Sequence, residues 1–347
     1  MADYLPSEID EATRDKVRPI SLLDLATHRS GLPRDTLNPR SRQRGTYVNY
    51  DYTEADLLLD LQQMNLEFSP GERFMYSNYG YALLGYALER AAEKDYALLV
   101  HEHVTGPIEL LDTRFELPDA SRGRLVTPYD EENPLVAREP ARIGKLSPPT
   151  ALYSTSSDLA KLMKKQLGEY REYLASGEET ELILTHQSLE AWEGTGIAYG
   201  LGFFDWGNGT FGHSGGMDGY GSEFSFDPRR NTGFILLTSS VGSWTQRLSV
   251  AALKATTEER VQPLDELVAV ETIIADFERR GPEAALKTYQ ALRSQRQSPL
   301  GEDGRITLIN LARQVGMDNA AKQFVADARA DLPDSNRIRE LAEALGY

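Results

Sequence analysis

Apolar residues in the first third of the chain recur at helical spacing. Residues 20–27 carry leucines that predict one short buried helix, and residues 57–61 carry the leucines of another. Thr53, which precedes an acidic first turn, is typical of an N-cap for that second helix. The run 81–88 places its apolar side chains on one face of a third helix. The long polar stretch 34–52 offers little to bury, so we expect a loop at the rim of a cleft.

Strand patterns are concentrated later in the chain. Tyr199–Asp205 comes first, Ser222–Asp227 alternates with a period of two, and Phe234–Thr238 is an apolar run. The turn-forming residues 228–233 join the last two segments, which predicts an antiparallel meander with one face covered. Residues 246–255 are expected to form a helix that packs on this sheet.

Beyond residue 262 the sequence predicts helices only. Pro263 suits the first position of a helix whose apolar stripe ends at Gly281, and Pro282 opens the next helix. The stretch 318–334 resembles one tetratricopeptide-type helical hairpin, and a single repeat is too few for a free-standing solenoid. Three more short amphipathic helices are expected, at 306–315, 320–330 and 338–345.

With 347 residues, the chain can hold a large core and a second small domain. We expect an α+β fold in residues 1–255, with an antiparallel sheet flanked by helices, followed by a helical C-terminal extension at residues 262–347. A stabilising cap on the main domain is the expected role of the extension, in preference to a groove for a partner.

Composition narrows the class of protein. The chain has 37 Lys and Arg against 53 Asp and Glu, a net charge of −16, so a nucleic-acid partner is not expected. Cysteine is absent, which removes disulfides, thiolate metal sites and cysteine nucleophiles.

No apolar run reaches membrane-spanning length, and residues 1–8 lack the basic and apolar regions of a secretory signal. We expect no cofactor, no metal and no membrane span. The location would be cytoplasmic as written, or periplasmic or secreted if a signal peptide was lost with the N-terminus.

The stretch Phe68–Gly85 carries the first candidate chemistry. Pro70-Gly71 predicts a turn, and Tyr76-Ser77-Asn78 then lies where this loop enters a buried helix. Side chains at such a junction are held by the helix yet still point into a cleft. The alternative is a capped core helix, with Ser77 or Asn78 as the cap and Tyr76 as packing.

The stretch Phe211–Gly221 is the second candidate. Its glycines let the backbone approach a ligand closely and leave N–H groups free to point at it. Gly212-His213-Ser214-Gly215-Gly216 also matches the G-x-S-x-G nucleophile elbow, but a strand follows it rather than a helix. His213 is moreover the last histidine, which excludes the chain order of an α/β-hydrolase triad. His101-Glu102-His103 is interpreted as an exposed charged turn rather than a metal site, because its spacing fits no usual zinc pattern.

Six landmarks follow one another along the first part of the chain. They are Tyr4-Leu5-Pro6, Thr27-His28-Arg29-Ser30-Gly31-Leu32-Pro33, Pro70–Gly85 with Tyr76-Ser77-Asn78, Tyr153–Ala160, Tyr199–Gly202 and Gly212–Gly216. In this order they resemble the serine beta-lactamase-related family, which comprises class C beta-lactamases, penicillin-binding proteins and esterase-like enzymes. The resemblance implies a beta-lactamase/transpeptidase-like fold. It also implies a serine hydrolase that cleaves a small-molecule or peptide substrate, an ester or an amide, through an acyl-enzyme.

The resemblance implies roles for the two candidate stretches. Tyr76 would share general-base work with the lysine of a Ser-x-x-Lys motif, and burial near cationic groups would favour its phenolate. Asn78 would orient the substrate amide, and the backbone N–H of Gly216 would form half of an oxyanion hole. His213-Ser214-Gly215 would be the substrate-binding strand motif. A histidine there implies a hydrogen bond rather than a fixed positive charge, which favours a neutral ester or a peptide over a carboxylate-bearing beta-lactam.

The Ser-x-x-Lys motif itself is missing, because no serine in the sequence is followed three positions later by a lysine. Ser154 or Ser156 as a substitute nucleophile has no base at a plausible spacing, and a helix N-cap is the preferred interpretation of these serines. We therefore expect an N-terminally truncated family member with impaired acyl transfer and an uncovered core through which it could form an oligomer. The alternative function is a non-catalytic binding or scaffold protein that uses the remaining cleft and the helical tail.

Overall fold

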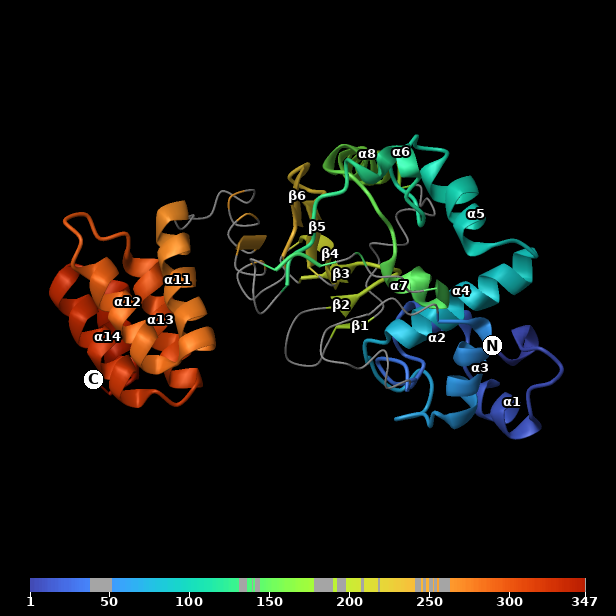
Figure 1. Ribbon diagram of the computed structural model, residues 1–347, viewed down its shortest axis with the longest axis horizontal. Helices are drawn as coiled ribbons and strands as arrows, with labels where there is room; N and C mark the ends of the chain where they lie inside the picture. The colour runs from blue at the N-terminus through green and yellow to red at the C-terminus, as the bar shows by residue number, and fades with distance from the viewer. Residues whose placement is uncertain are drawn as a thin grey trace. The chain divides into compact units, whose positions relative to one another are not determined.

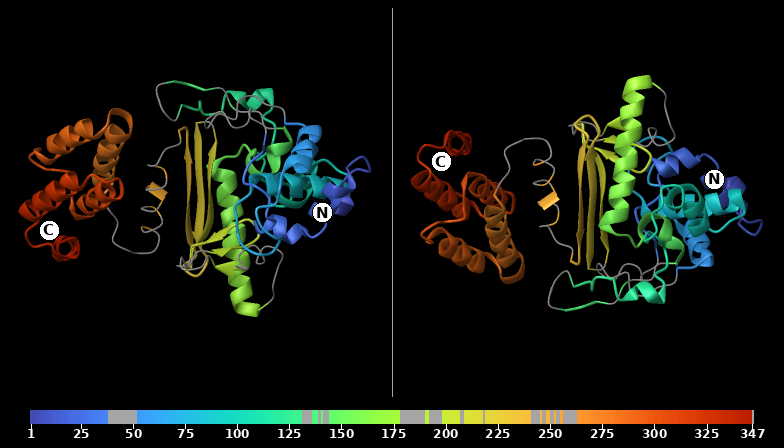
Figure 2. Two further views of the ribbon diagram at one scale, coloured as in Figure 1. Left: turned by 90° about the horizontal axis from the view of Figure 1, so that it is seen from below. Right: turned by 90° about the horizontal axis from the view of Figure 1, so that it is seen from above.

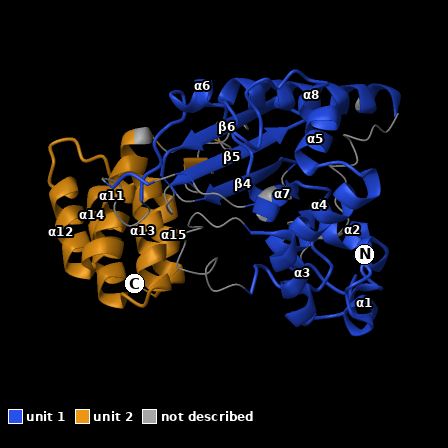
Figure 3. Ribbon diagram, turned by 45° about the vertical axis from the view of Figure 1, so that its right-hand side comes forward, with its two compact units in different colours: residues 1–245 blue, residues 246–347 orange. Residues whose placement is uncertain are grey.

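The computed structural model describes residues 1–346 apart from 38–51, 131–135, 139, 141–143, 178–189, 192–197, 207–208, 218, 241–244, 246–247, 250–251, 253–254 and 256–262. The chain forms two compact units, Met1–Thr245 and Gln246–Tyr347 (Figures 1 and 3). Most of the predicted loop 34–52 and of the predicted helix 246–255 lies outside the described residues. The predicted domain limits, 1–255 and 262–347, stay a prediction.

Helices dominate the first 177 residues of the first unit. They are α1 (Glu11–Val17), α2 (Leu22–Ala26), α3 (Glu54–Gln63), α4 (Asn78–Ala92), α5 (Tyr96–Val100), α6 (Asp119–Arg122), α7 (Ser147–Thr150) and α8 (Ser156–Ser176), with single turns at Ala2–Tyr4, His101–Thr105 and Gly144–Leu146. The predicted N-cap Thr53 is confirmed, since its hydroxyl accepts the backbone N–H of Asp56, whose carboxylate returns the bond. Ser21 caps α2 with the same capping box.

Helix α4 forms the centre of the first core. Tyr79, Leu83 and Ala87 recur at four-residue spacing and are completely buried, as helical periodicity requires for a core-facing stripe. Leu57 and Leu61 of α3 belong to the same core. The Tyr79 hydroxyl donates to the Leu57 carbonyl at 2.6 Å, so this buried tyrosine leaves no polar atom unpaired. This packing fixes the start of α4, where the first candidate residues lie.

A six-stranded antiparallel sheet forms the other part of the first unit, and each strand pairs with its neighbour in sequence. The strands are β1 (Glu190–Ala191), β2 (Ala198–Tyr199), β3 (Phe204–Asp205), β4 (Phe211–Met217), β5 (Tyr220–Asp227) and β6 (Thr232–Thr238). Helix α8 runs along one face, where Met163 and Leu167 pack against Phe224 and Phe226 (Figure 2). The predicted antiparallel sheet flanked by helices is therefore confirmed, as is the meander of β5 and β6.

One strand prediction was wrong. Residues 199–205 form two short strands, β2 and β3, because the chain turns between them at Gly202, whose φ is 100°. Residues 211–217, which contain the strand motif implied by the resemblance, form strand β4. Glycine permits this pairing at Gly212, since a Cβ there would lie 2.4 Å from the carbonyl oxygen of Phe224.

The described part of the second unit is helical. It contains α11 (Leu264–Arg280), α12 (Pro282–Arg293), α13 (Glu302–Gln314), α14 (Asp318–Asp331) and α15 (Asn336–Ala344), close to the predicted ranges. Pro263 is the N-cap of α11 rather than its first residue, whereas Pro282 does open α12. The helices share one apolar core around Ile309, Ala321 and Ala328. None of the helices described in the two units is long and apolar enough to span a membrane.

Candidate active site

Tyr76, Ser77 and Asn78 form the entry to α4. Ser77 is the N-cap of this helix, and its hydroxyl also donates to the Pro33 carbonyl at 2.7 Å. Asn78 is the first helical residue, and its Nδ2 donates to Oδ1 of Asp35 at 3.0 Å. Ser77 is 1% exposed, whereas Tyr76 and Asn78 are half-buried. The turn therefore uses the Ser77 hydroxyl for structure and presents the side chains on either side of it.

His213 and its neighbours lie on β4. His213 is opposite Phe224 of β5 and is half-buried, while Ser214, Gly215 and Gly216 are exposed. A Cβ at Gly215 would lie 2.5 Å from a side-chain oxygen of β5, so the strand pairing itself favours glycine there. The glycines predicted to approach a ligand are thus also required by the sheet.

Tyr76 and His213, far apart in the sequence, are brought together by the fold. Their ring centroids are 6.0 Å apart. Phe204 of β3 contacts both: its ring lies 5.2 Å from His213 and 6.5 Å from Tyr76, and it is nearly parallel to the tyrosine. Trp206 extends this stack at 4.9 Å from Phe204. The rings of Tyr76 and His213 therefore lie in one aromatic cluster, while the amide of Asn78 is engaged by Asp35.

His28 is the residue of this region to which sequence reasoning assigned no role. Its ring is 2% exposed and lies 4.2 Å from the Tyr76 ring and 4.7 Å from the rings of Tyr81 and Tyr199. Its Nδ1 accepts the backbone N–H of Ser77 at 3.0 Å. His28 belongs to the landmark motif Thr27–Pro33. Its place in that motif is the sequence feature that could have identified it as a site residue.

The two histidines of the site favour their neutral forms. Burial, with a smaller contribution from repulsion by the neighbouring His213, lowers the pKa of His28 to about 3. Burial also lowers the pKa of His213. At neutral pH both imidazoles are therefore uncharged and can act as hydrogen-bonding groups only.

Charged side chains occur at one side of Tyr76. The Arg34 guanidinium lies 5.7 Å from the centre of the Tyr76 ring, within the range of a cation–π contact. Arg34 also pairs with Asp35 at 3.6 Å, and Asp35 accepts the bond from Asn78. The positive charge beside Tyr76 is therefore partly balanced by an adjacent carboxylate.

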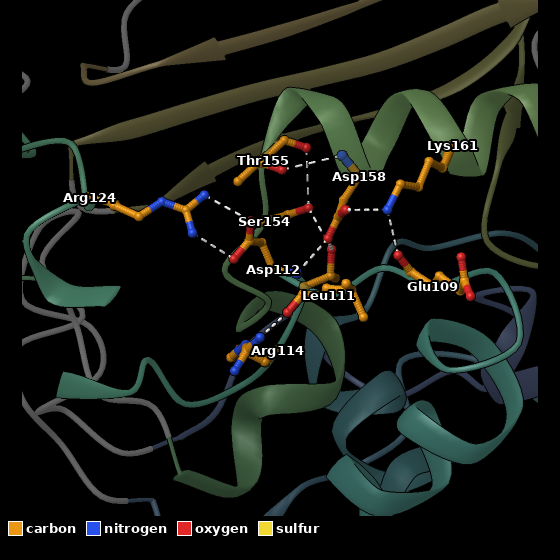
Figure 4. A network of polar contacts seen from close by, with 10 residues as sticks. Glu109, Leu111, Asp112, Arg114, Arg124, Ser154, Thr155, Asp158 and Lys161 are labelled. Atoms are coloured by element: carbon orange, nitrogen blue, oxygen red, sulfur yellow. Dashed lines mark hydrogen bonds and ion pairs between the residues drawn. The ribbon is translucent and has the colours of Figure 1, made fainter. Parts of the chain in front are cut away.

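Ser154 is not placed as a nucleophile. Its Oγ lies 2.9 Å from Oγ1 of Thr113, which in turn donates to Oδ2 of Asp158 at 3.0 Å (Figure 4). Lys161 of this network is bound to Asp158 at 3.3 Å. The N-cap of α8 is Thr155, so the cap was misplaced by one residue. The network ties the chain at Thr113 to the start of α8.

His101-Glu102-His103 lies in a single helical turn after α5. Glu102 pairs with Lys94 at 2.6 Å, and His101 Nδ1 lies 3.2 Å from the Thr105 hydroxyl. Among the residues that the structure describes, no three His, Asp or Glu side chains form a group suited to a metal ion. Within this turn, Glu102 and His101 are therefore engaged by neighbouring side chains.

Comparison with known proteins gives one family over most of the chain. A sequence model of the beta-lactamase family matches residues 1–257. The human beta-lactamase-like 1 protein is 30% identical over 221 residues, which cover 61% of this chain and 42% of that protein. The D-alanyl-D-alanine-carboxypeptidase/endopeptidase AmpH of Escherichia coli strain K12 is 27% identical over 246 residues, 64% of this chain and 59% of its own. The chain thus spans about half the length of the curated relatives it matches.

Solved structures support the predicted fold. A class C beta-lactamase superimposes with a TM-score of 0.58 at 17% identity, covering 75% of this chain and 74% of its own. The octameric penicillin-binding protein homologue from Pyrococcus abyssi gives a TM-score of 0.57 at 21% identity, covering 78% and 65%. The beta-lactamase/transpeptidase-like fold expected from the sequence is confirmed.

Proposed function

Because the chain belongs to the beta-lactamase family, we propose that Tyr76 and His213 belong to the acyl-transfer site of a serine hydrolase. The observation that carries the proposal is the 6.0 Å separation of their two rings, which come from different parts of the fold. Tyr76 would take the proton of an attacking hydroxyl, and Asn78 would orient the substrate amide. The exposed strand His213–Gly216 would bind the substrate, with the Gly216 N–H contributing to an oxyanion hole.

The substrate we propose is a neutral ester or amide, from a small molecule or a peptide. His213 has a lowered pKa and is uncharged at neutral pH, so it offers a hydrogen bond where a lysine would offer a fixed charge. Arg34 is the cation beside Tyr76, and Asp35 neutralises part of its charge. The rings of Phe204 and Trp206 favour an apolar group on the substrate.

We further propose that this chain alone does not form an acyl-enzyme. Its sequence contains no Ser-x-x-Lys. Ser77 is buried and bonded to the Pro33 carbonyl, and Ser154 is bonded to Thr113. Among the described residues, neither hydroxyl is hydrogen-bonded to a histidine, lysine or carboxylate side chain, the groups that activate a serine nucleophile. Binding of a ligand without turnover, the alternative function, would follow from the same arrangement.

Mass spectrometry of the full chain after exposure to a fluorophosphonate, penicillin G and p-nitrophenyl acetate tests the nucleophile. We expect no stoichiometric adduct on any serine. A serine adduct formed in a one-to-one ratio would overturn this part of the proposal, and its position would identify the nucleophile.

Binding of phenylacetamide, a neutral amide, tests the site independently of turnover. We expect the ring signals of Tyr76 and His213 to shift on titration, and the variants Tyr76→Phe and His213→Ala to weaken binding about tenfold, or about 1.4 kcal/mol. Tyr173→Phe on α8 is the matched control and should leave the dissociation constant unchanged. Equal binding by all three variants would exclude Tyr76 and His213 from the site.

A further inference from the structure

We propose that His28 is the positioning residue for Tyr76, a neutral imidazole that fixes the backbone on both sides of that tyrosine. The inference rests on the role of Tyr76 proposed above, and adds to it a residue that does not itself touch the substrate.

His28 holds the amide before Tyr76 and the amide after it. The N–H of Met75 donates to the His28 carbonyl at 2.7 Å, and the N–H of Ser77 donates to His28 Nδ1 at 3.0 Å. The Ser77 bond restrains the peptide plane that follows Tyr76, and the Met75 bond restrains the plane between Phe74 and Met75, one residue further back. The backbone segment that carries Tyr76 is therefore held by a single residue from a distant segment.

The backbone of His28 is itself held in an unusual conformation. Its φ is 57°, in the left-handed region that is unfavourable for residues other than glycine and asparagine. The chain is anchored there because the Arg29 N–H donates to the Asp24 carbonyl of α2 at 2.7 Å. An unfavourable backbone angle held by the surrounding structure is a feature of functional sites.

The hydrogen bond at Nδ1 decides the tautomer. Because Nδ1 accepts the Ser77 amide proton, the proton of the neutral ring must be on Nε2. Nε2 is buried and has no hydrogen-bond partner in the described part of the chain. The rings of Tyr76, Tyr81 and Tyr199 surround the imidazole at 4.2–4.7 Å. An imidazolium would lose the bond from Ser77 and place a charge among these rings, so the ring has to stay neutral to do its work.

Nitrogen NMR of the wild-type imidazole is the first test, and it needs no variant. We expect an unprotonated Nδ1 and a protonated Nε2 at His28, unchanged between pH 8 and pH 5. A spectrum with the proton on Nδ1, or an imidazolium at pH 6, would overturn the proposal.

Two substitutions separate the acceptor from the ring. His28→Asn keeps a residue that tolerates positive φ and places an amide oxygen near the position of Nδ1. His28→Gly keeps the backbone conformation and removes the acceptor. We expect hydrogen exchange at the Ser77 amide to be at least about tenfold faster in His28→Gly and within about threefold of wild type in His28→Asn. Amides in the middle of α4, such as Leu84, should be unchanged and report that the helix is intact.

The ring signals of Tyr76, assigned with Tyr76→Phe, give a second readout. They should shift in His28→Gly, and equal Ser77 exchange in the two variants with an unshifted Tyr76 would show that His28 only packs. Should His28→Gly fail to fold, the wild-type tautomer still decides. None of these readouts needs a ligand or turnover. Failure of the proposed function and failure of this inference are therefore distinguishable.

Discussion

The candidate site of the first unit and the helical second unit hold their polar side chains in opposite ways. On one side of Tyr76 the polar groups are neutral: two histidines with lowered pKa values lie among aromatic rings, whereas Arg34 approaches the Tyr76 ring and pairs with Asp35. In the second unit, charges are paired directly. Arg293 contacts Asp331 at 2.6 Å and Asp327 at 2.8 Å, and Arg305, with its side chain 3% exposed, contacts Asp331 at 2.9 Å.

This difference indicates what each region is built for. Ion pairs with complementary geometry lock helices against one another, and hydrogen bonding to Arg293 lowers the pKa of Asp331. A buried aromatic environment has a low effective dielectric constant, which strengthens electrostatic interactions within it. The second unit therefore holds its helices together through paired charges, whereas the turn around Tyr76 relies mainly on aromatic contacts and neutral hydrogen-bonding groups.

The three tryptophans make the comparison measurable. They occupy positions 192, 206 and 244, all within the unit Met1–Thr245. Tryptophan fluorescence therefore reports unfolding of the first unit, while the helical circular dichroism signal reports both units.

Gly212→Val should have the largest effect, and only on the first unit. The new Cβ would lie 2.4 Å from the Phe224 carbonyl oxygen, so β4 and β5 could not keep their spacing. We expect a loss of about 3 kcal/mol or more in the free energy of unfolding by tryptophan fluorescence. Gly168→Ala in α8 is the matched control: a Cβ there meets nothing within 4 Å, and helix propensity predicts a gain of about 0.5–1 kcal/mol. A Gly212→Val protein as stable as wild type would refute the close pairing of these strands.

Arg305→Ala should act on the second unit. It removes the bond from Nε to the Leu300 carbonyl, at 2.9 Å, and the ion pair with Asp331. Because Asp331 keeps Arg293 and is partly exposed, we expect a loss of about 2–3 kcal/mol, seen in the helical signal and not in tryptophan fluorescence.

Arg305→Met separates the contribution of the Arg305 charge from that of its packing. Nη1 of Arg305 is buried without a hydrogen-bond partner in the described part of the chain. An apolar side chain of similar length would remove this unpaired donor, so Arg305→Met should cost less than Arg305→Ala. Equal losses in the two variants would show that the charge, rather than the packing, carries the stability.

Lowering the pH from 7 to 5 should reduce the free energy of unfolding of the first unit by about 2 kcal/mol more than that of the second. His28 has a pKa of about 3 in the folded chain and about 6.5 when unfolded, so the unfolded state takes up the proton first. Stability of the first unit should therefore fall below pH 6.5, by about 2 kcal/mol at pH 5 from His28 alone, and the fall should continue to about pH 3.

Urea unfolding at pH 7 and pH 5, followed by tryptophan fluorescence, measures this effect. His28→Asn should remove most of the pH dependence, although His213, whose pKa is also lowered, adds a contribution of the same sign. In the second unit Asp331 has a lowered pKa, so the stability that it contributes is lost only as the pH falls below the ordinary carboxylate range. The same slope in wild type and His28→Asn would contradict the neutral buried state of His28.

Local patterns were sufficient for much of the fold. The helices of the second unit, the cap at Thr53 and the strands β5 and β6 depend on residues close together in the sequence, and periodicity and capping chemistry predicted them. The six ordered landmarks indicated the family for the same reason, because each is a short local motif.

Strand β4 shows where local patterns fail. Glycine has a low strand propensity, so local propensity alone does not predict a strand at Phe211–Met217. What makes it a strand is the partner: β5 approaches so closely that a side chain at Gly212 would not fit. Residue propensities do not include this close pairing with β5. Only the tertiary structure therefore explains the glycine at position 212.

The sequence by itself determined which residues could carry chemistry at Tyr76–Asn78 and at His213–Gly216. Only the tertiary structure decided that the Tyr76 and His213 rings would lie 6.0 Å apart and that Asn78 would bind Asp35. It also decided the position of His28, whose bond to Ser77 spans 49 positions. Contacts at such separations depend on how whole elements pack, because chain entropy opposes each of them until the core forms.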